Sequence, residues 1–268
     1  MYDPAEISPP PPPWETLPTM YDLPSEEVGE PGLPDDFHRL QGNLLSDTCE
    51  PINIPSDKRF TACDLNLYYD PRNPLWYKRP DWYLVLDVGP TTKENDIRLS
   101  YVIWQEGVRP FLVVELLSPG TEGEDLGTKL RDASKPPSKW QVYEQILAVP
   151  YYVVYDRYEH NFRAFRLNGT RYEAIDLSSG RLWFEELQLG LGLWEGSYKG
   201  ILTLWLRWYD ANGWIPTDSE RAQAAQEEVQ QERDRASAAE EEAQQQRQRA
   251  EKLAEFLRSQ GIDPDAIS

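Results

Sequence analysis

The chain has 268 residues, a formal net charge of −19 and 40% hydrophobic residues, a length that suits one globular core with appendages. The two cysteines are too few for a disulfide scaffold or a four-ligand zinc site, and the two histidines argue against a histidine-rich metal centre. No run of 18 apolar residues and no signal-peptide pattern occurs, so we expect a cytoplasmic protein without a membrane span.

The negative charge is concentrated in the two ends of the chain. Residues 1–36 hold nine acids and no lysine or arginine, and residues 217–268 hold thirteen acids against seven bases. The 180 residues between them therefore carry only −4 of the total charge. A nearly neutral core with local basic patches can still bind phosphate groups, although it lacks long-range electrostatic steering.

The first segment, residues 1–33, contains the run Pro9–Pro13, further prolines and many acids. We expect it to be extended or disordered, because it has little apolar surface to bury. The proline run could dock into an aromatic groove of a partner, but a plain linker is the favoured interpretation.

The second segment, residues 34–210, is rich in tryptophan and tyrosine and is predicted to be the globular part. Its pattern predicts six strands, which lie near residues 60–69, 82–88, 111–117, 151–156, 162–167 and 171–175. The last two flank Asn168-Gly169, a strong signal for a hairpin turn.

A helix is predicted between the third and fourth strands. Ser138 is a good N-cap, and Trp140, Tyr143 and Leu147 recur at helical spacing up to Ala148. A strand–helix–strand order implies a parallel crossover, so the expected fold class is α/β with a mixed sheet flanked by helices.

The third segment, residues 217–260, is predicted to be helical from its Ala, Glu, Gln and Arg content. A heptad seam, from position 225 to position 257, is apolar at eight of its ten positions, but most of these residues are alanines. A dimerising coiled coil and a solvated single helix are therefore equally compatible with the pattern. A third possibility is that the core itself dimerises through the stretch around Trp205 and Trp208.

Two acids stand out within the predicted strands. Glu115 interrupts the apolar run from Phe111 to Leu117, and Asp81 opens the run that begins at Trp82. A lone buried carboxylate costs several kcal/mol, roughly, unless an ion pair, a raised pKa or a metal compensates it. If the two acids converge, a hard cation such as Mg²⁺ or Mn²⁺ would relieve their repulsion. The alternatives are a strand-end acid at Asp81 and a buried ion pair at Glu115.

An ordered series of motifs resembles a known bacterial family. It comprises Pro80-Asp81, VVELLSPGT (113–121), DLGTK (125–129), KWQVY (139–143) and VPYYVVYD (149–156). The series is similar to the Uma-two family of restriction endonucleases, in the PD-(D/E)XK nuclease superfamily, over roughly residues 60–195. The resemblance implies a restriction-endonuclease-like core, in which Asp81 and Glu115 bind the metal and a lysine orients the attacking water.

The position of that lysine departs from the superfamily pattern. Most members carry it two residues after the glutamate, where this chain has Leu117. The family instead places it four residues after an Asp and four before a Tyr, and here the two anchors point to different residues, Lys129 and Lys139. We favour Lys139 as the catalytic lysine, because the predicted helix that follows Ser138 holds it rigidly. Tyr143 is expected to pack in the core, with a hydroxyl that can donate to the site.

The function implied by the resemblance is metal-dependent cleavage of phosphodiester bonds in nucleic acid, most readily DNA, by a possible homodimer. Ser118 and Thr121 could contact phosphate, although a turn at Ser118-Pro119-Gly120 is the favoured role. The alternative is a catalytically inactive nuclease-fold module that binds or assembles. A Glu115 ion pair sealed away from any cavity would favour that alternative.

Overall fold

The computed structural model describes residues 35–118, 121–128, 135–177 and 179–261. They fall into two compact units, divided between Ile215 and Pro216. The predicted Pro-rich segment at residues 1–33 lies outside the described residues.

The centre of the first unit is a six-stranded mixed sheet. Strands β6 and β7 run parallel, and every other neighbouring pair in this sheet is antiparallel. The parallel crossover and the Asn168-Gly169 hairpin, which joins β8 to β9, are thereby confirmed. In spatial order the strands are β1 (Arg59–Cys63), β4 (Trp82–Leu86), β6 (Leu112–Leu116), β7 (Tyr151–Asp156), β8 (Asn161–Asn168) and β9 (Arg171–Ala174).

The prediction of a single strand at residues 60–69 was wrong. Asp64 adopts a φ of 49°, a left-handed conformation that ends β1, and the chain then enters a different, three-stranded sheet. That small sheet has the order β3-β2-β5, with β2 parallel to β5 and antiparallel to β3. Its strands are β2 (Leu67–Tyr68), β3 (Tyr77–Lys78) and β5 (Tyr101–Val102), and the nearby short helices are η1 (Ser56–Lys58), η2 (Glu94–Asp96) and α3 (Ile103–Glu106).

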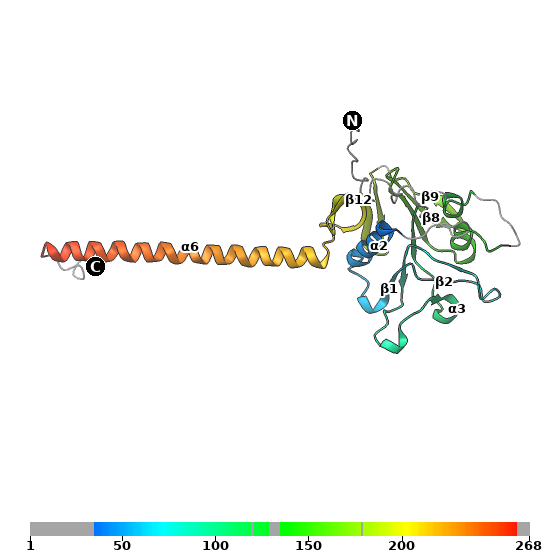
Figure 1. The fold of residues 1–268 in the computed structure, drawn as a ribbon, viewed down its shortest axis with the longest axis horizontal. Coiled ribbons are helices and arrows are strands. Elements are labelled where there is room, and N and C mark those ends of the chain that lie inside the picture. The colour runs from blue at the N-terminus through cyan, green and yellow to red at the C-terminus, as the bar shows by residue number, and fades with distance from the viewer. Residues whose placement is uncertain (1–34, 119–120, 129–134, 178, 262–268) are drawn as a thin grey trace, which may run out of the picture. The chain divides into compact units, whose positions relative to one another are not determined.

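A four-stranded antiparallel sheet and a helix were not predicted as elements. The sheet consists of β10 (Arg181–Phe184), β11 (Leu189–Tyr198), β12 (Ile201–Asp210) and β13 (Gly213–Trp214). Helix α2 (Asp36–Thr48) lies against β12 and β1 (Figure 1). The buried amide of Gln41 fastens α2 to β12, because its Nε2 donates to Leu206 O at 2.7 Å and its Oε1 accepts from Leu206 N at 2.9 Å.

The six-stranded sheet is buried on both faces. One face packs against α2 and the four-stranded sheet, and the other packs against the crossover helix and the small sheet. Trp205 and Trp208 are both 0% exposed, within the first of these layers. The idea that they form a dimerising surface is therefore wrong.

The crossover between β6 and β7 contains α4 (Glu122–Asp125), α5 (Lys139–Gln141) and the π-helical turn η3 (Val142–Ile146). Ser138 caps α5 as predicted, because its side chain accepts from Gln141 N while the Gln141 side chain accepts from Ser138 N. A π-helical turn inserts an extra residue into the helix and often occurs at functional sites. Here it carries Tyr143.

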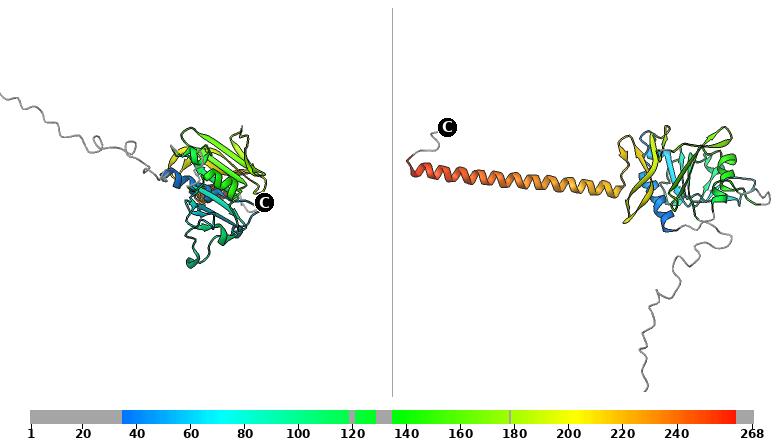
Figure 2. Two further views of the ribbon diagram at one scale, coloured as in Figure 1. Left: turned by 90° about the vertical axis from the view of Figure 1, so that its right-hand side faces the viewer. Right: turned by 90° about the horizontal axis from the view of Figure 1, so that it is seen from above.

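The second unit is a single helix, α6 (Asp218–Ser259), uninterrupted in all views (Figure 2). None of its described residues is buried, and Thr217 with Glu220 forms the capping box at its start. Large apolar side chains, including Val229, Leu253 and Phe256, are exposed along it. No helix among the described residues has the combination of length and apolar character that crossing a membrane requires.

The exposure of α6 leads to a prediction about truncation. A chain that ends at residue 216 should keep its melting temperature within one or two degrees, because α6 contributes no buried residue to a core. If the seam at Val229 and Leu253 pairs two chains, sedimentation should show a dimer for the full chain and a monomer after truncation. The same oligomeric state for both proteins would make α6 a solvated helix.

Candidate active site

Asp81 and Glu115 converge across two neighbouring strands. Because Trp82 pairs with Val114 in the antiparallel register, Asp81 and Glu115 are the next opposed pair along β4 and β6. Asp81 N donates to Glu115 Oε2 at 3.4 Å, and Leu116 N donates to Asp81 Oδ2 at 2.6 Å. The two acids that the sequence singled out therefore share one site.

Both carboxylate oxygens of Glu115, which is 0% exposed, have partners from the crossover helix. Lys139 Nζ lies 2.9 Å from Oε2, and the Tyr143 hydroxyl donates to Oε1 at 2.7 Å. The two residues are four positions apart, so they lie on one side of the helical segment. The cap at Ser138 positions Lys139, and its side chain keeps 24% exposure, so the ammonium reaches solvent as well as Glu115.

Asp125, at the end of α4, is a third acid of the site that sequence reasoning did not assign. It is 1% exposed, and its Oδ1 lies 3.3 Å from Lys139 Nζ without a hydrogen bond of good geometry. The sequence signal was available, because Asp125 is the anchor of one of the two lysine registers. That register was used to search for a lysine rather than to consider the acid itself.

The electrostatics of the cluster show an excess of negative charge. Burial, together with the charges of Asp81 and Asp125, raises the pKa of Glu115 well above its usual value, although Lys139 opposes this. Burial also raises the pKa of Asp125. For Lys139, burial alone would lower the pKa, but Glu115 and Asp125 raise it well above its usual value. One protonated lysine thus faces three acids, and an added cation would relieve their repulsion.

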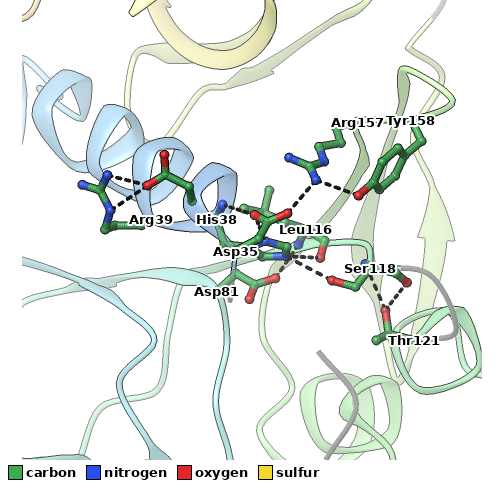
Figure 3. Close-up of polar contacts among 10 residues, drawn as sticks. Asp35, His38, Arg39, Asp81, Leu116, Ser118, Thr121, Arg157 and Tyr158 are labelled. Atoms are coloured by element: carbon green, nitrogen blue, oxygen red, sulfur yellow. Dashed lines mark hydrogen bonds and ion pairs between the residues drawn. The ribbon is translucent and has the colours of Figure 1, made fainter. Parts of the chain in front are cut away.

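A second group of polar contacts holds the end of β6 (Figure 3). The His38 ring, on α2, lies with Nδ1 2.7 Å from Asp35 Oδ1 and Nε2 3.1 Å from Leu116 O. Arg157 donates to the other oxygen of Asp35 at 2.6 Å. Burial would lower the pKa of His38, but the hydrogen bond to Asp35 and the charge of Asp81 raise it. The chain next to Glu115 is thereby tied to α2.

Ser118 and Thr121 have the favoured turn role. Thr121 N and Thr121 Oγ1 both donate to Ser118 O, each at 3.1 Å, and Ser118 N donates to Thr121 Oγ1 at 3.3 Å. Lys129 lies outside the described residues, so its place relative to the cluster stays a prediction. Lys135 is exposed.

The donor set of the cluster fits a hard divalent cation. No three His, Cys, Asp or Glu side chains of the described chain are grouped as a ready metal site. Mg²⁺ nevertheless needs only one or two carboxylates, because water and substrate phosphate supply its other ligands. Asp81 and Glu115 provide such a pair, and the buried Oδ1 of Asp125 without a hydrogen bond adds local negative charge. These two acids are the residues that would hold the ion.

The hydroxyl of Tyr143 offers a test of how Glu115 is held. Tyr143→Phe removes the 2.7 Å hydrogen bond to a buried carboxylate oxygen and should lower the free energy of unfolding by roughly 1–3 kcal/mol. Tyr172→Phe is the matched control, since that hydroxyl donates to the main-chain Val149 O. Chemical denaturation should show similar losses of stability for both, whereas only Tyr143→Phe should slow cleavage.

Comparison with known proteins gives a family match and one distant structural likeness. The model of the Uma2 (Uma-two) family, described as "Putative restriction endonuclease", matches residues 13–204. No curated protein matches the chain. A crystal structure described as a "putative nuclease belonging to DUF820" from Anabaena variabilis is 15% identical, with a TM-score of 0.37, and covers 55% of this chain and 71% of its own. That likeness is too low to argue from.

Proposed function

The chain belongs to the Uma2 family, whose model spans most of the core, and we propose that this core is a metal-dependent endonuclease that hydrolyses phosphodiester bonds in DNA. The observation that carries the proposal is the convergence of Asp81, Glu115 and Lys139 within one partly open cluster. Two strand-borne carboxylates and a fixed ammonium are the groups that metal-assisted phosphodiester cleavage requires.

Each residue of the cluster has a distinct part in the proposed reaction. Asp81 and Glu115 bind the cation, which when bound supplies charge stabilisation at the phosphoryl oxygen and acidifies a water. Lys139 orients the attacking water and offsets negative charge that develops on the phosphate. Tyr143 fixes the orientation of Glu115, and the His38 contact fixes the main chain at Leu116.

A catalytically inactive binding module is the second candidate, and one observation favours it. Both oxygens of the fully buried Glu115 already have partners, Tyr143 and Lys139, in a closed ion pair. Against this, the Lys139 ammonium balances only one of the three acids and remains partly exposed. The two candidates differ in whether the cluster releases Glu115 to a cation.

The test is a cleavage assay with single- and double-stranded DNA in Mg²⁺, Mn²⁺ or EDTA. Cleavage that requires the cation and disappears in Asp81→Ala supports the endonuclease. Cleavage that persists in EDTA would contradict the metal-dependent mechanism. Binding of DNA without cleavage under every condition would favour the inactive module.

A further inference from the structure

A cleft opens beside the carboxylate cluster. It has a volume of about 500 Å³, and its walls come from two segments that are far apart in the sequence. One wall is the loop from Asp70 to Trp76, and the other is the stretch from Pro137 to Ile146, which includes the helix that bears Lys139. Since Pro137 and Gln141 flank Lys139 by two residues on each side, the cleft adjoins the proposed reaction centre.

Lys78 joins the loop wall to the cluster. It lies two residues after Trp76, so the two side chains point to the same side of β3, and its own side chain is only 14% exposed. In the described part of the chain, its ammonium makes no hydrogen bond, and its ion pair, to Glu124 Oε2, is long at 3.8 Å. Its charge is felt by the cluster, because Glu115, Asp125 and Lys139 all act on the pKa of Lys78, which burial lowers. A partly buried ammonium without a hydrogen bond is ready to bind an anion.

The chemistry of the cleft suits a nucleotide. Arg72 is 87% exposed and, although paired with Asp70, leaves its Nη1 free among the described contacts. Gln141 uses its Oε1 in the helix cap, and Gln145 uses its Nε2 on Glu144, so each amide retains one group for a base edge. The indole of Trp76 forms part of the lining and is the only aromatic ring there. A cation, two amides and a ring supply phosphate, hydrogen-bond and stacking contacts.

The size of the cleft selects the form of the nucleic acid. A volume of about 500 Å³ is that of a small-molecule site and accommodates one or two nucleotides, but not a base-paired duplex. A strand enters such a cleft only where its bases are unpaired, so that a ring can stack on the exposed face of the indole.

We propose that this cleft, with Lys78 as its phosphate-binding lysine, is a subsite for an unpaired strand next to the scissile bond. The inference deepens the proposed endonuclease function and rests on it for the position of that bond. It makes Lys78 a positioning residue for substrate, and it gives single-stranded DNA, or a duplex with a single-stranded extension, as the substrate class.

The experiment measures binding of the full chain to a short labelled single-stranded DNA by fluorescence anisotropy. Ca²⁺ replaces Mg²⁺, and a denaturing gel verifies that the strand stays intact. Lys78→Met should weaken binding by about tenfold and reduce the slope of log affinity against log salt by about 0.7, because one phosphate contact is lost. Gln145→Glu, on an exposed residue, should weaken binding by repulsion even if Lys78→Met fails to fold.

Matched controls separate local from general effects. Lys199→Met removes an exposed lysine from the β11–β12 turn, and Gln223→Glu alters an exposed glutamine that, like Gln145, bonds a glutamate on its own helix. Both should bind the strand as the unmodified chain does. An RNA strand of the same sequence, a blunt duplex and a duplex with a single-stranded extension complete the comparison.

The outcomes distinguish this proposal from the endonuclease itself. Equal binding by Lys78→Met and by Gln145→Glu, or tighter binding of the blunt duplex than of the single strand, would overturn the subsite. If RNA binds more tightly than DNA with the same dependence on Lys78, the subsite stands and its strand is RNA. A chain that binds single strands through Lys78 but cleaves none retains the subsite and loses the proposed catalysis.

Discussion

Replacing Glu115 with glutamine is expected to reduce the rate of metal-dependent cleavage by on the order of 10³-fold, as when an electrostatic group of a transition state is removed. The substitution keeps the side-chain volume and an oxygen for the Tyr143 hydroxyl, which now donates to Oε1 at 2.7 Å. It removes the charge that pairs with Lys139 at 2.9 Å and that would bind the cation with Asp81. Single-turnover cleavage rates in Mg²⁺ and Mn²⁺ measure the effect.

Glu144→Gln is the matched control for this experiment. Glu144 is also a buried acid, 3% exposed, and lies next to Tyr143 in the π-helical turn. Its partners, however, are Tyr172 N at 2.9 Å and Arg171 at 3.3 Å, away from Asp81. Its loss should cost stability but leave cleavage by the folded protein intact. Equal loss of activity in both variants would show that Glu115 acts only through the fold.

The central parts of the site could be predicted because they lie in strongly patterned elements. Glu115 is conspicuous as the one polar residue of a strand buried on both faces, and the Ser138 cap fixed the start of the helix that carries Lys139. Asp125 and Lys78 could not be recognised in this way. Asp125 lies among the other acids of α4, and Lys78 lies on a two-residue strand, so only tertiary packing distinguishes them from solvated charges.

The elements that were missed have sequence patterns that contradict their structures. Helix α2 buries His38 and Gln41, polar residues that obscure its apolar side until their hydrogen bonds are known. Strand β11 contains three glycines, which disfavour strands in isolation. At Gly190 a β-carbon would lie 2.0 Å from the ring of Tyr209, so the glycine is needed for the ring to lie flat on the sheet. Propensity alone cannot reveal that kind of cross-strand packing.

The net charge likewise misleads unless it is assigned to regions. The charge of −19 for the whole chain suggests a protein that repels nucleic acid, yet the ends carry most of it. Within the core, the acids that matter are those around Lys139, where a cation would reverse the local field. Cleavage of DNA would therefore depend on the bound ion and on a few placed cations such as Lys78 rather than on the overall potential.

Lys139→Met is expected to remove most of the cleavage activity while the chain still binds metal, because a lysine that orients water is not a ligand. The substitution leaves Glu115 and Asp125 without their shared ammonium, at 2.9 Å and 3.3 Å, so the melting temperature without metal should fall. Added Mn²⁺ should then raise it by more than in the unmodified chain, since the ion binds only the folded form and relieves the repulsion.

Two further lysines make this result specific to the register of the active site. Lys135→Met alters an exposed lysine in the same connection and should keep full activity. Lys129→Ala tests the other family anchor, four residues after Asp125, and should reduce cleavage less than the change at Lys139. The structure gives the reason for this order, because Lys139 already contacts both Glu115 and Asp125 from a capped helix. If Lys129→Ala proved the more damaging change, Lys139 would be a structural counter-charge, and the water-orienting amine would have to come from the Asp125 side.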